Sequence, residues 1–305
     1  MSVAFTRPPQ SNARRMGRRF LRHRLAVGSL VLLTVMAMLS ICAPLIEYLL
    51  GIDAETANLF DRFQPPSSAH PLGTDEAGRD VLARLLHGGR VSLAVAMAAA
   101  LTSAILGTAI GLFAGYYGGW LDRFLMRFTD GVIALPLLPL LIVLAAVDLS
   151  KLGLPDSVTQ SEDVSLYRIV VIISLFGWTT VARLVRAETL SLKNREFVRA
   201  AVAQGATAGR IMRTHILPNA ISPIIVATTL SVGGIILFES VLSFLGLGIQ
   251  PPVASWGNML TNAQDLVWDA PLLAVWPGLL IFVTVIAFNF LGDGLQDAMD
   301  PRAVD

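Results

Sequence analysis

Long apolar runs constrain this chain more than any other feature of its sequence. A membrane-spanning helix needs about 20 consecutive apolar residues to cross the roughly 30 Å hydrocarbon core. Five runs reach or nearly reach that length, at residues 25–46, 91–115, 131–147, 219–238 and 270–292. Only 15% of the residues are charged, whereas a soluble domain carries about 25%. The sequence therefore predicts an all-α integral membrane protein.

A sixth apolar run, residues 169–182, is shorter than a spanning helix. It reaches spanning length if Arg168 extends to the outer surface and Arg183 and Arg186 extend to the inner one. Counting it, we predict six transmembrane helices. The first run is too long for a secretory signal and lacks a small-residue cleavage site, so we expect it to be retained.

Basic residues indicate which side of the membrane each connector faces. Arginines crowd the segment before the first run, which places the amino terminus, and after six spans the carboxyl terminus, in the cytoplasm. The predicted outer segments 148–168 and 246–269 contain only Lys151 and Arg168 as basic residues. The long outer loop 51–90 is the exception, because its arginines are mixed with acidic residues.

Two segments outside the spans carry helix signals. Residues 13–24 can form a basic amphipathic helix on the inner leaflet, for which electrostatic anchoring is a simpler role than partner recognition. In the first outer loop, Gly73-Thr74-Asp75 predicts a helix start with Thr74 as N-cap. We expect that helix to lie along the membrane surface until Val91 turns the chain inward.

Small residues recur every four positions in the second run, at Ser103, Gly107, Gly111, Gly115 and Gly119. Such a stripe brings helices close together in a membrane, where no hydrophobic force drives their association. We expect it to pack against a helix of this chain or of another subunit, with pore lining as the alternative.

Polar residues within or near the runs are few: Asp130, Asp148, Glu239 and Asn289. An ion-coupled carrier usually needs paired ionisable groups inside the membrane, and Glu239 has no evident partner at helical spacing. We expect Glu239 to cap a helix or to form hydrogen bonds near the outer end of the fifth span, rather than to contact a substrate.

The chain carries no motif for its own chemistry. There is no phosphate-binding GxxxxGK[ST] loop, no HExxH, no GxSxG and no Cys/His cluster, and Cys42 is the single cysteine. We therefore expect no catalytic residue, no metal site and no disulfide. Any energy source must be a separate subunit or an ion gradient.

The segment 197–219, between the fourth and fifth runs, is unusual for a connector. It combines basic residues with a helix of small side chains, and Leu217-Pro218 closes it. We predict a helix of about three turns, a break at Gly205 and a second basic stretch. Small residues permit close backbone approach, so the segment suits a groove on another protein. The alternative is a re-entrant or merely cationic connector.

Several motifs resemble one family, in that family's order, from about residue 14 to 302. Arg199-Ala200-Ala201, Gly205 and Ile216-Leu217-Pro218 resemble the EAA loop of binding-protein-dependent ABC permeases. The C-type permease of dipeptide and oligopeptide importers is similar at residues 70–75, 78–80, 90–93, 239–248, 251–257 and 291–302. One departure is Arg199, where the family pattern has Glu, so no ion pair of that Glu is carried over.

This resemblance implies a type I ABC importer permease fold, MetI-like, with six transmembrane helices and cytoplasmic termini. It implies a homologous second permease subunit, two ATP-binding subunits, and a periplasmic or lipid-anchored substrate-binding protein. ATP and Mg would be used by the ATP-binding subunits, so we expect no cofactor on this chain. Membrane lipid is its other expected partner, and nucleic acid is not expected.

The resemblance also assigns roles to residues. The ATPase-coupling residues would be Arg199, Ala200, Ala201, Gly205, Leu217 and Pro218, within a coupling loop at 188–218. A periplasmic gate or binding-protein contact would include Gly73, Asp75, Ser255, Trp256 and Gly257. The alternatives for these are a helix start at 73–75 and a tight outer turn with Trp256 in the membrane interface.

We therefore predict the permease subunit of an ATP-driven importer of the bacterial inner membrane, translocating di- or oligopeptides or a related small solute. Its parts would be a basic tail (1–24), a first helix with periplasmic loop (25–90), a transmembrane domain (91–297) and a carboxyl tail (298–305). The alternative function is an ion-coupled secondary transporter or channel, against which stands the lack of paired intramembrane charges.

Overall fold

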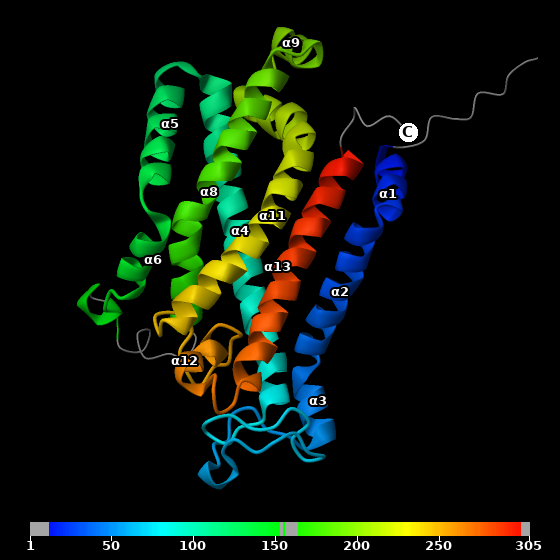
Figure 1. The fold of residues 1–305 in the computed structure, drawn as a ribbon. Helices are drawn as coiled ribbons and strands as arrows, with labels where there is room; N and C mark the ends of the chain where they lie inside the picture. Colours follow the sequence, from blue (N-terminus) through cyan, green and yellow to red (C-terminus); the bar gives the residue numbers. More distant parts are fainter. Residues whose placement is uncertain (1–11, 153–154, 156–163, 300–305) are drawn as a thin grey trace, which may run out of the picture.

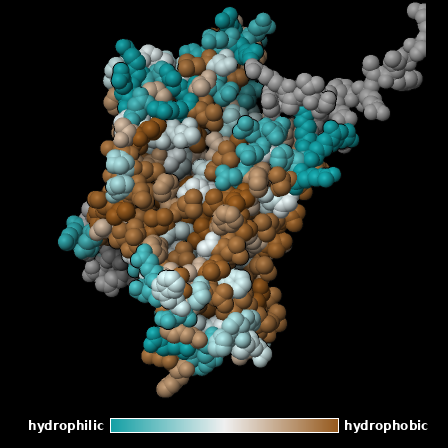
Figure 2. All heavy atoms as spheres, viewed as in Figure 1, coloured by the Kyte–Doolittle hydropathy of each residue, from teal (hydrophilic) through white to brown (hydrophobic). Residues whose placement is uncertain are grey.

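The computed structural model describes residues 12–152, 155 and 164–299, and long helices dominate them. Five helices are long and apolar enough to cross a membrane, and one bent pair makes a sixth when it is counted as one span. The unbent spans are α2 (Arg24–Ile41), α4 (Val81–Tyr117), α8 (Val164–Lys193), α11 (Leu217–Phe244) and α13 (Leu272–Met299). Apolar side chains form a broad band across the middle of the molecule, with hydrophilic side chains at both ends (Figure 2). The six-span prediction is confirmed.

The two ends of the molecule differ in which segments they gather (Figure 1). One end holds α1 (Asn12–Arg22), the last turn of α13 and the connector between α8 and α11. The opposite end holds α3 (Ala43–Leu50), the first loop and α12 (Ala263–Leu266). Basic connectors stay inside, so we call the first end cytoplasmic and the second periplasmic.

The third span is broken, unlike the single run expected at 131–147. It consists of α5 (Gly119–Ala134) and α6 (Leu137–Ala145), which meet at an angle of 84°. Pro136 causes the break, because it has no N–H to donate and disfavours helical backbone at the residue before it. Leu135 accordingly adopts an extended conformation, with φ −74° and ψ 139°.

The fourth span is longer than its apolar run suggested. Helix α8 has 30 residues, and its arginines pair within the protein instead of extending to the membrane surfaces. Arg183 binds Asp130 of α5 and Arg186 binds Asp122 of α5, while an Arg168 Nη donates to the Leu247 carbonyl at 3.2 Å. Pairing lowers the cost of charge in a membrane, which lets this helix span.

The helix start predicted at Thr74 is wrong. Asp80 caps α4 instead, since its Oδ1 accepts a hydrogen bond from the Ala83 N–H at 2.9 Å. Gly73 and Gly78 have φ angles of 82° and 77°, so the residues before Asp80 form a turn rather than a helix. Helix α4 then runs for 37 residues without turning at Val91.

The amino-terminal part also bends where a single run was expected. Helix α2 ends at Ile41, and Pro44 lies in the first turn of α3. The predicted basic helix is present as α1, and His23 separates it from α2; its contact with the inner leaflet stays a prediction. Residues 1–11 and 300–305 of the two predicted tails lie outside the described residues, and α13 extends to Met299.

The small-residue stripe of α4 lies directly against α8. A Cβ at Gly107 would lie 2.5 Å from the Trp178 carbonyl oxygen, and one at Gly111 would lie 2.6 Å from that of Ala182. Gly115 meets α8 in the same way, and Ser103 faces Gly177. The stripe therefore packs within the chain instead of lining a pore. Gly119 is not part of it, because a Cβ there would meet nothing within 4 Å.

Candidate functional site

The connector between α8 and α11 projects from the cytoplasmic end as a short helix, α9 (Glu196–Ala203), followed by α10 (Ala208–Ile211) (Figure 1). Helix α9 has 8 residues, about two turns rather than the three we predicted. Glu196 lies in its first turn, where an acidic side chain complements the positive end of the helix dipole. A positive charge early in a helix opposes the same dipole, so Glu196 offsets the effect of Arg199.

Gly205 ends α9 where we predicted a break, but for another reason. Its φ is 81°, its N–H donates to the Val202 carbonyl at 2.9 Å, and the Ala206 N–H donates to the Ala201 carbonyl at 3.0 Å. These two bonds form a Schellman motif, which favours glycine at the left-handed position. A Cβ on Gly205 would meet nothing within 4 Å, so backbone conformation, not close approach, requires this glycine.

Helix α9 has an inward and an outward face. Val198 and Ala201 are 1% and 8% exposed. Val198 belongs to a small apolar cluster that also holds Leu112, Tyr116, Leu192, Ile211 and Ile216. Arg199 and Ala200 are exposed on the other face. The predicted coupling residues are therefore divided, because Ala201 seats the helix on its own chain and only its neighbours can meet another protein.

The basic residues around α9 are divided in the same way. Arg183 and Arg186 form their ion pairs with α5, and Lys193 donates to the Tyr116 carbonyl. The other four are exposed and form no ion pair with any residue in the described part of the chain: Arg195, Arg199, Arg210 and Arg213. The outward side of the connector is therefore positively charged.

Helix α11 begins at Leu217-Pro218, the pair that closes the connector in the sequence, but the helical backbone already starts before it. Apolar helix continues from Ala208 to Phe244, through a π-helical turn, η3 (Met212–Ile216), into α11. A π turn changes the backbone hydrogen-bond register, and Pro218, with no N–H, lies in the first turn of α11. Helices α10 and α11 therefore form one continuous helix, which follows α9 in the chain.

A cavity of about 750 Å³ lies between α8, α11 and α13. Its lining is mostly apolar and includes the polar side chains of Thr180, Glu188, Ser222, Ser231 and Gln296. Sequence reasoning missed these residues, since isolated hydroxyl and amide groups in apolar helices give no periodic signal. Helix α9 lies in the connector between α8 and α11, two of the helices that form this cavity.

The five predicted periplasmic residues are buried: Gly73, Asp75, Ser255, Trp256 and Gly257. Asp75 Oδ2 pairs with an Arg79 Nη at 2.8 Å and with Arg84 Nε at 3.2 Å. Buried side chains cannot form the surface that meets a binding protein, so any such contact would use their neighbours. Their role in a gate stays a prediction.

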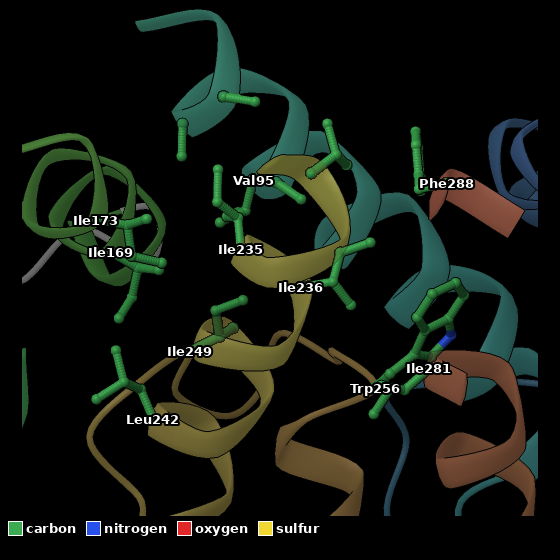
Figure 3. Packing of buried hydrophobic residues seen from close by; sticks show 14 of the residues in the cluster. Val95, Ile169, Ile173, Ile235, Ile236, Leu242, Ile249, Trp256, Ile281 and Phe288 are labelled. Carbon is green, nitrogen blue, oxygen red and sulfur yellow. The ribbon is translucent and has the colours of Figure 1, made fainter. Parts of the chain in front are cut away.

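Trp256 is a core residue, so the alternative that placed it in the membrane interface is wrong. It is 1% exposed and packs among the buried apolar residues of α4, α11 and α13 (Figure 3). Its Nε1–H donates to the Leu85 carbonyl at 3.0 Å, and the absence of side chains at Gly88 and Gly89 makes room for its ring.

Glu239 forms hydrogen bonds near the periplasmic end, as predicted, and has partners that we did not identify. Ser243 Oγ donates to its Oε1 at 2.8 Å, and Ser92 Oγ donates to its Oε2 at 3.1 Å. The two serines in turn accept backbone N–H groups, Ser92 from Trp256 and Ser243 from Ile249. One fully buried carboxyl group thus joins α4, α11 and the loop after α11.

Comparison with known proteins identifies the family and the fold of this chain. Residues 107–305 match the model of the family described as binding-protein-dependent transport system inner membrane component. Residues 11–66 match the N-terminal TM domain of oligopeptide transport permease C. An inward-facing structure of the MetNI methionine ABC transporter shares the fold, with a TM-score of 0.55 and 18% identity over 71% of this chain and 97% of that one.

Relatives are similar along nearly their whole length. The glutathione transport system permease protein of Pectobacterium atrosepticum is 40% identical over 95% of this chain and 91% of its own. The oligopeptide transport system permease protein of Escherichia coli K12 is 39% identical, over 93% and 89%. The dipeptide transport system permease protein of Alkalihalophilus pseudofirmus is 38% identical, over 92% and 87%. The chain belongs to the family of binding-protein-dependent transport system inner membrane components and is a transmembrane permease subunit of an ABC importer.

Proposed function

We propose that this permease translocates di- or oligopeptides, or a related small solute, across a bacterial inner membrane, and that α9 couples it to ATP-hydrolysing subunits. The solute class follows the relatives, whose names specify dipeptide, oligopeptide and glutathione transport. The weakly polar cavity between α8, α11 and α13 supports a path that admits solutes of different sequence.

The two-faced geometry of α9 carries the coupling proposal. Its outward face is exposed and lies beside arginines that form no ion pair with the described residues, while Val198 and Ala201 hold its inward face on the bundle. A protein that binds the outward face can therefore move α9 together with the ends of α8 and α11. Such a displacement would open or narrow the cavity that these helices line.

The complete transporter would contain a homologous second permease subunit, two ATP-binding subunits at the cytoplasmic end and a substrate-binding protein at the periplasmic end. ATP and Mg would be used by the ATP-binding subunits. The cavity between α8, α11 and α13 is not fully enclosed by this chain, and the second permease would complete it. Arg199, Ala200 and Gly205 would shape the docking surface, whereas Leu217 and Pro218 would transmit its movement to α11.

Affinity purification of the tagged chain from its native membrane, followed by mass spectrometry, tests the coupling site. We expect a second permease and P-loop ATPases to co-purify, and Ala200→Trp to remove the ATPases because the indole blocks the outward face. Ala57→Trp, an exposed alanine in the periplasmic loop, is the matched control and should retain them. Recovery of the chain alone under mild detergent would contradict the proposal.

Uptake of labelled alanyl-alanine by proteoliposomes containing the purified complex tests transport. We expect accumulation that requires the binding protein outside the vesicles and ATP inside them. Arg199→Glu reverses an exposed charge on the docking surface, so it should weaken ATPase retention if an acidic group lies opposite. Unchanged retention and unchanged uptake by that variant would show that Arg199 makes no specific pair.

A further inference from the structure

A second concavity of about 320 Å³ lies on the outer surface of the bundle, between α2 and α13. These helices run side by side at the edge of the molecule away from α5 and α6 (Figure 1). The groove lies at the junction of two regions, since α2 is within the N-terminal match and α13 is within the main family match.

The groove has a low floor and high apolar walls. Gly28, Ser29 and Ala287 form the floor, and Ser29 and Ala287 are 7% and 2% exposed. Leu25 and Phe282 stand at the walls and are 57% and 60% exposed. A Cβ on Gly28 would meet nothing within 4 Å. This profile leaves a channel that can receive a hydrocarbon chain lying along the helices.

Positive charge marks the cytoplasmic end of the groove. Arg24 is the first residue of α2 and lines the groove, and both it and Arg22 are exposed. The positive end of the α2 dipole lies at the same place. Asp297 of α13 lies 3.7 Å from His23 Nε2, and neither Arg22 nor Arg24 forms an ion pair with a residue in the described part of the chain.

We propose that this groove binds an anionic phospholipid of the inner leaflet, with one acyl chain along Gly28 and the phosphate against Arg24 and Arg22. At membrane depth an apolar groove must be covered by hydrocarbon or by protein. The basic end favours lipid over protein. A protein that covered Arg24 would have to supply a buried counter-charge, whereas anionic lipid headgroups are already present at this leaflet. The lipid would fasten the N-terminal helix to α13, independently of the transported solute.

Native mass spectrometry of the purified transporter, titrated with phosphatidylglycerol and phosphatidylcholine, tests the proposal. We expect phosphatidylglycerol to bind more tightly to the wild type. Gly28→Phe, at a position where a Cβ would meet nothing within 4 Å, should fill the groove and abolish the tight binding. Gly278→Phe is the matched control, because its Cβ on α13 is equally unobstructed but lies outside the groove. Arg24→Gln should reduce the preference for phosphatidylglycerol about fivefold.

Three results would overturn the proposal. The first is equal affinity of the wild type for the two lipids. The second is undiminished phosphatidylglycerol binding by Gly28→Phe, in a preparation whose melting temperature shows that it is folded. The third is efficient photocrosslinking from a probe at Gly28 to another protein subunit rather than to lipid. We expect normal peptide uptake by Gly28→Phe, because the lipid site is separate from the transport path.

Discussion

The periplasmic and cytoplasmic ends of this permease are held together in different ways. At the periplasmic end, Glu239, Ser92 and Trp256 form a buried hydrogen-bonded network that joins two spans to the following loop. At the cytoplasmic end, α9 rests on a small cluster whose fully buried members are Val198, Ile211 and Ile216. We therefore expect the first end to act as a fixed frame and, following the coupling proposal, the second to act as a projecting lever that moves as a unit.

The two ends nevertheless use the same device to end a helix. Gly246 terminates α11 with φ 72°, and the Gly246 and Leu247 N–H groups donate to the Ser243 and Leu242 carbonyls. This is the Schellman pattern found at Gly205. A Cβ at either glycine would meet nothing within 4 Å. Substitutions at these two glycines should therefore cause similar backbone strain, so any difference between their effects comes from where each glycine lies in the molecule.

The largest expected effect comes from removing the tryptophan of the fixed frame. Trp256→Ala deletes a buried ring and its hydrogen bond to Leu85, which should cost about 3–5 kcal/mol of unfolding free energy. Trp268→Ala is the control, because Trp268 is 89% exposed. Thermal unfolding in detergent, monitored by size-exclusion chromatography, gives the melting temperatures of both variants. Similar melting temperatures for the two variants would contradict the burial assigned to Trp256.

Glu239 gives the next largest effect. Glu239→Leu leaves the hydroxyls of Ser92 and Ser243 without their acceptor, at about 1–3 kcal/mol for each buried group. Glu239→Gln keeps one acceptor oxygen and should lose roughly half as much. We expect the melting temperature to be highest for the wild type, lower for Glu239→Gln and lowest for Glu239→Leu. If Leu equals or exceeds the wild type, the network does not stabilise the frame.

Local sequence signals were enough to predict the spans, the cytoplasmic connector and its break. Hydropathy is a property of each segment, and a helix end at Gly205 follows from the conformational freedom of one residue. The four-residue stripe likewise predicted close packing from spacing alone, although only the structure identifies α8 as its partner. The resemblance of the motifs to a permease family predicted the subunits with which the chain assembles.

Tertiary contacts explain the predictions that were wrong. Thr74 and Asp80 are both suitable N-caps, and the turn through Gly73 and Gly78 decides between them. Trp256 follows a surface-like Pro-rich turn, yet its ring fits space left by glycines of α4. The arginines of α8 pair with α5, a distant part of the sequence. No local pattern predicts such pairings.

The two Schellman glycines test the lever directly. Gly205→Ala and Gly246→Ala each place a side chain in the left-handed region, at about 1–2 kcal/mol, so their melting temperatures should fall by similar amounts. Only Gly205→Ala reorients α9, and only it should uncouple ATP hydrolysis from uptake in proteoliposomes. If Gly246→Ala uncouples transport equally, the effect comes from general strain and the distinction between frame and lever fails.

The smallest expected effect concerns the acid stability of the periplasmic loop. Asp53 accepts hydrogen bonds from the Thr56 hydroxyl and from the Glu55 N–H at 2.8 Å, and these bonds lower the pKa of its carboxyl below the ordinary range. A carboxyl with a lowered pKa in the folded state contributes stability at neutral pH, which is lost as acidification passes through that lowered pKa. Because Asp53 is exposed, the contribution should be well under about 1 kcal/mol.

Limited proteolysis of the loop measures this contribution. At pH 7 we expect Asp53→Asn to be cleaved somewhat faster than the wild type, because Asn lacks the charge that strengthens these bonds. The difference should disappear once the pH falls below the lowered pKa, where the wild-type carboxyl is also neutral. Asp265→Asn, an exposed carboxylate in the other periplasmic segment, controls for the loss of charge alone. A pH-independent difference between Asp53→Asn and the wild type would mean that the side-chain shape, and not the ionised hydrogen bonds, orders the loop. The periplasmic frame would then owe its rigidity to the buried network of Glu239 and Trp256, with no measurable help from the exposed carboxylate.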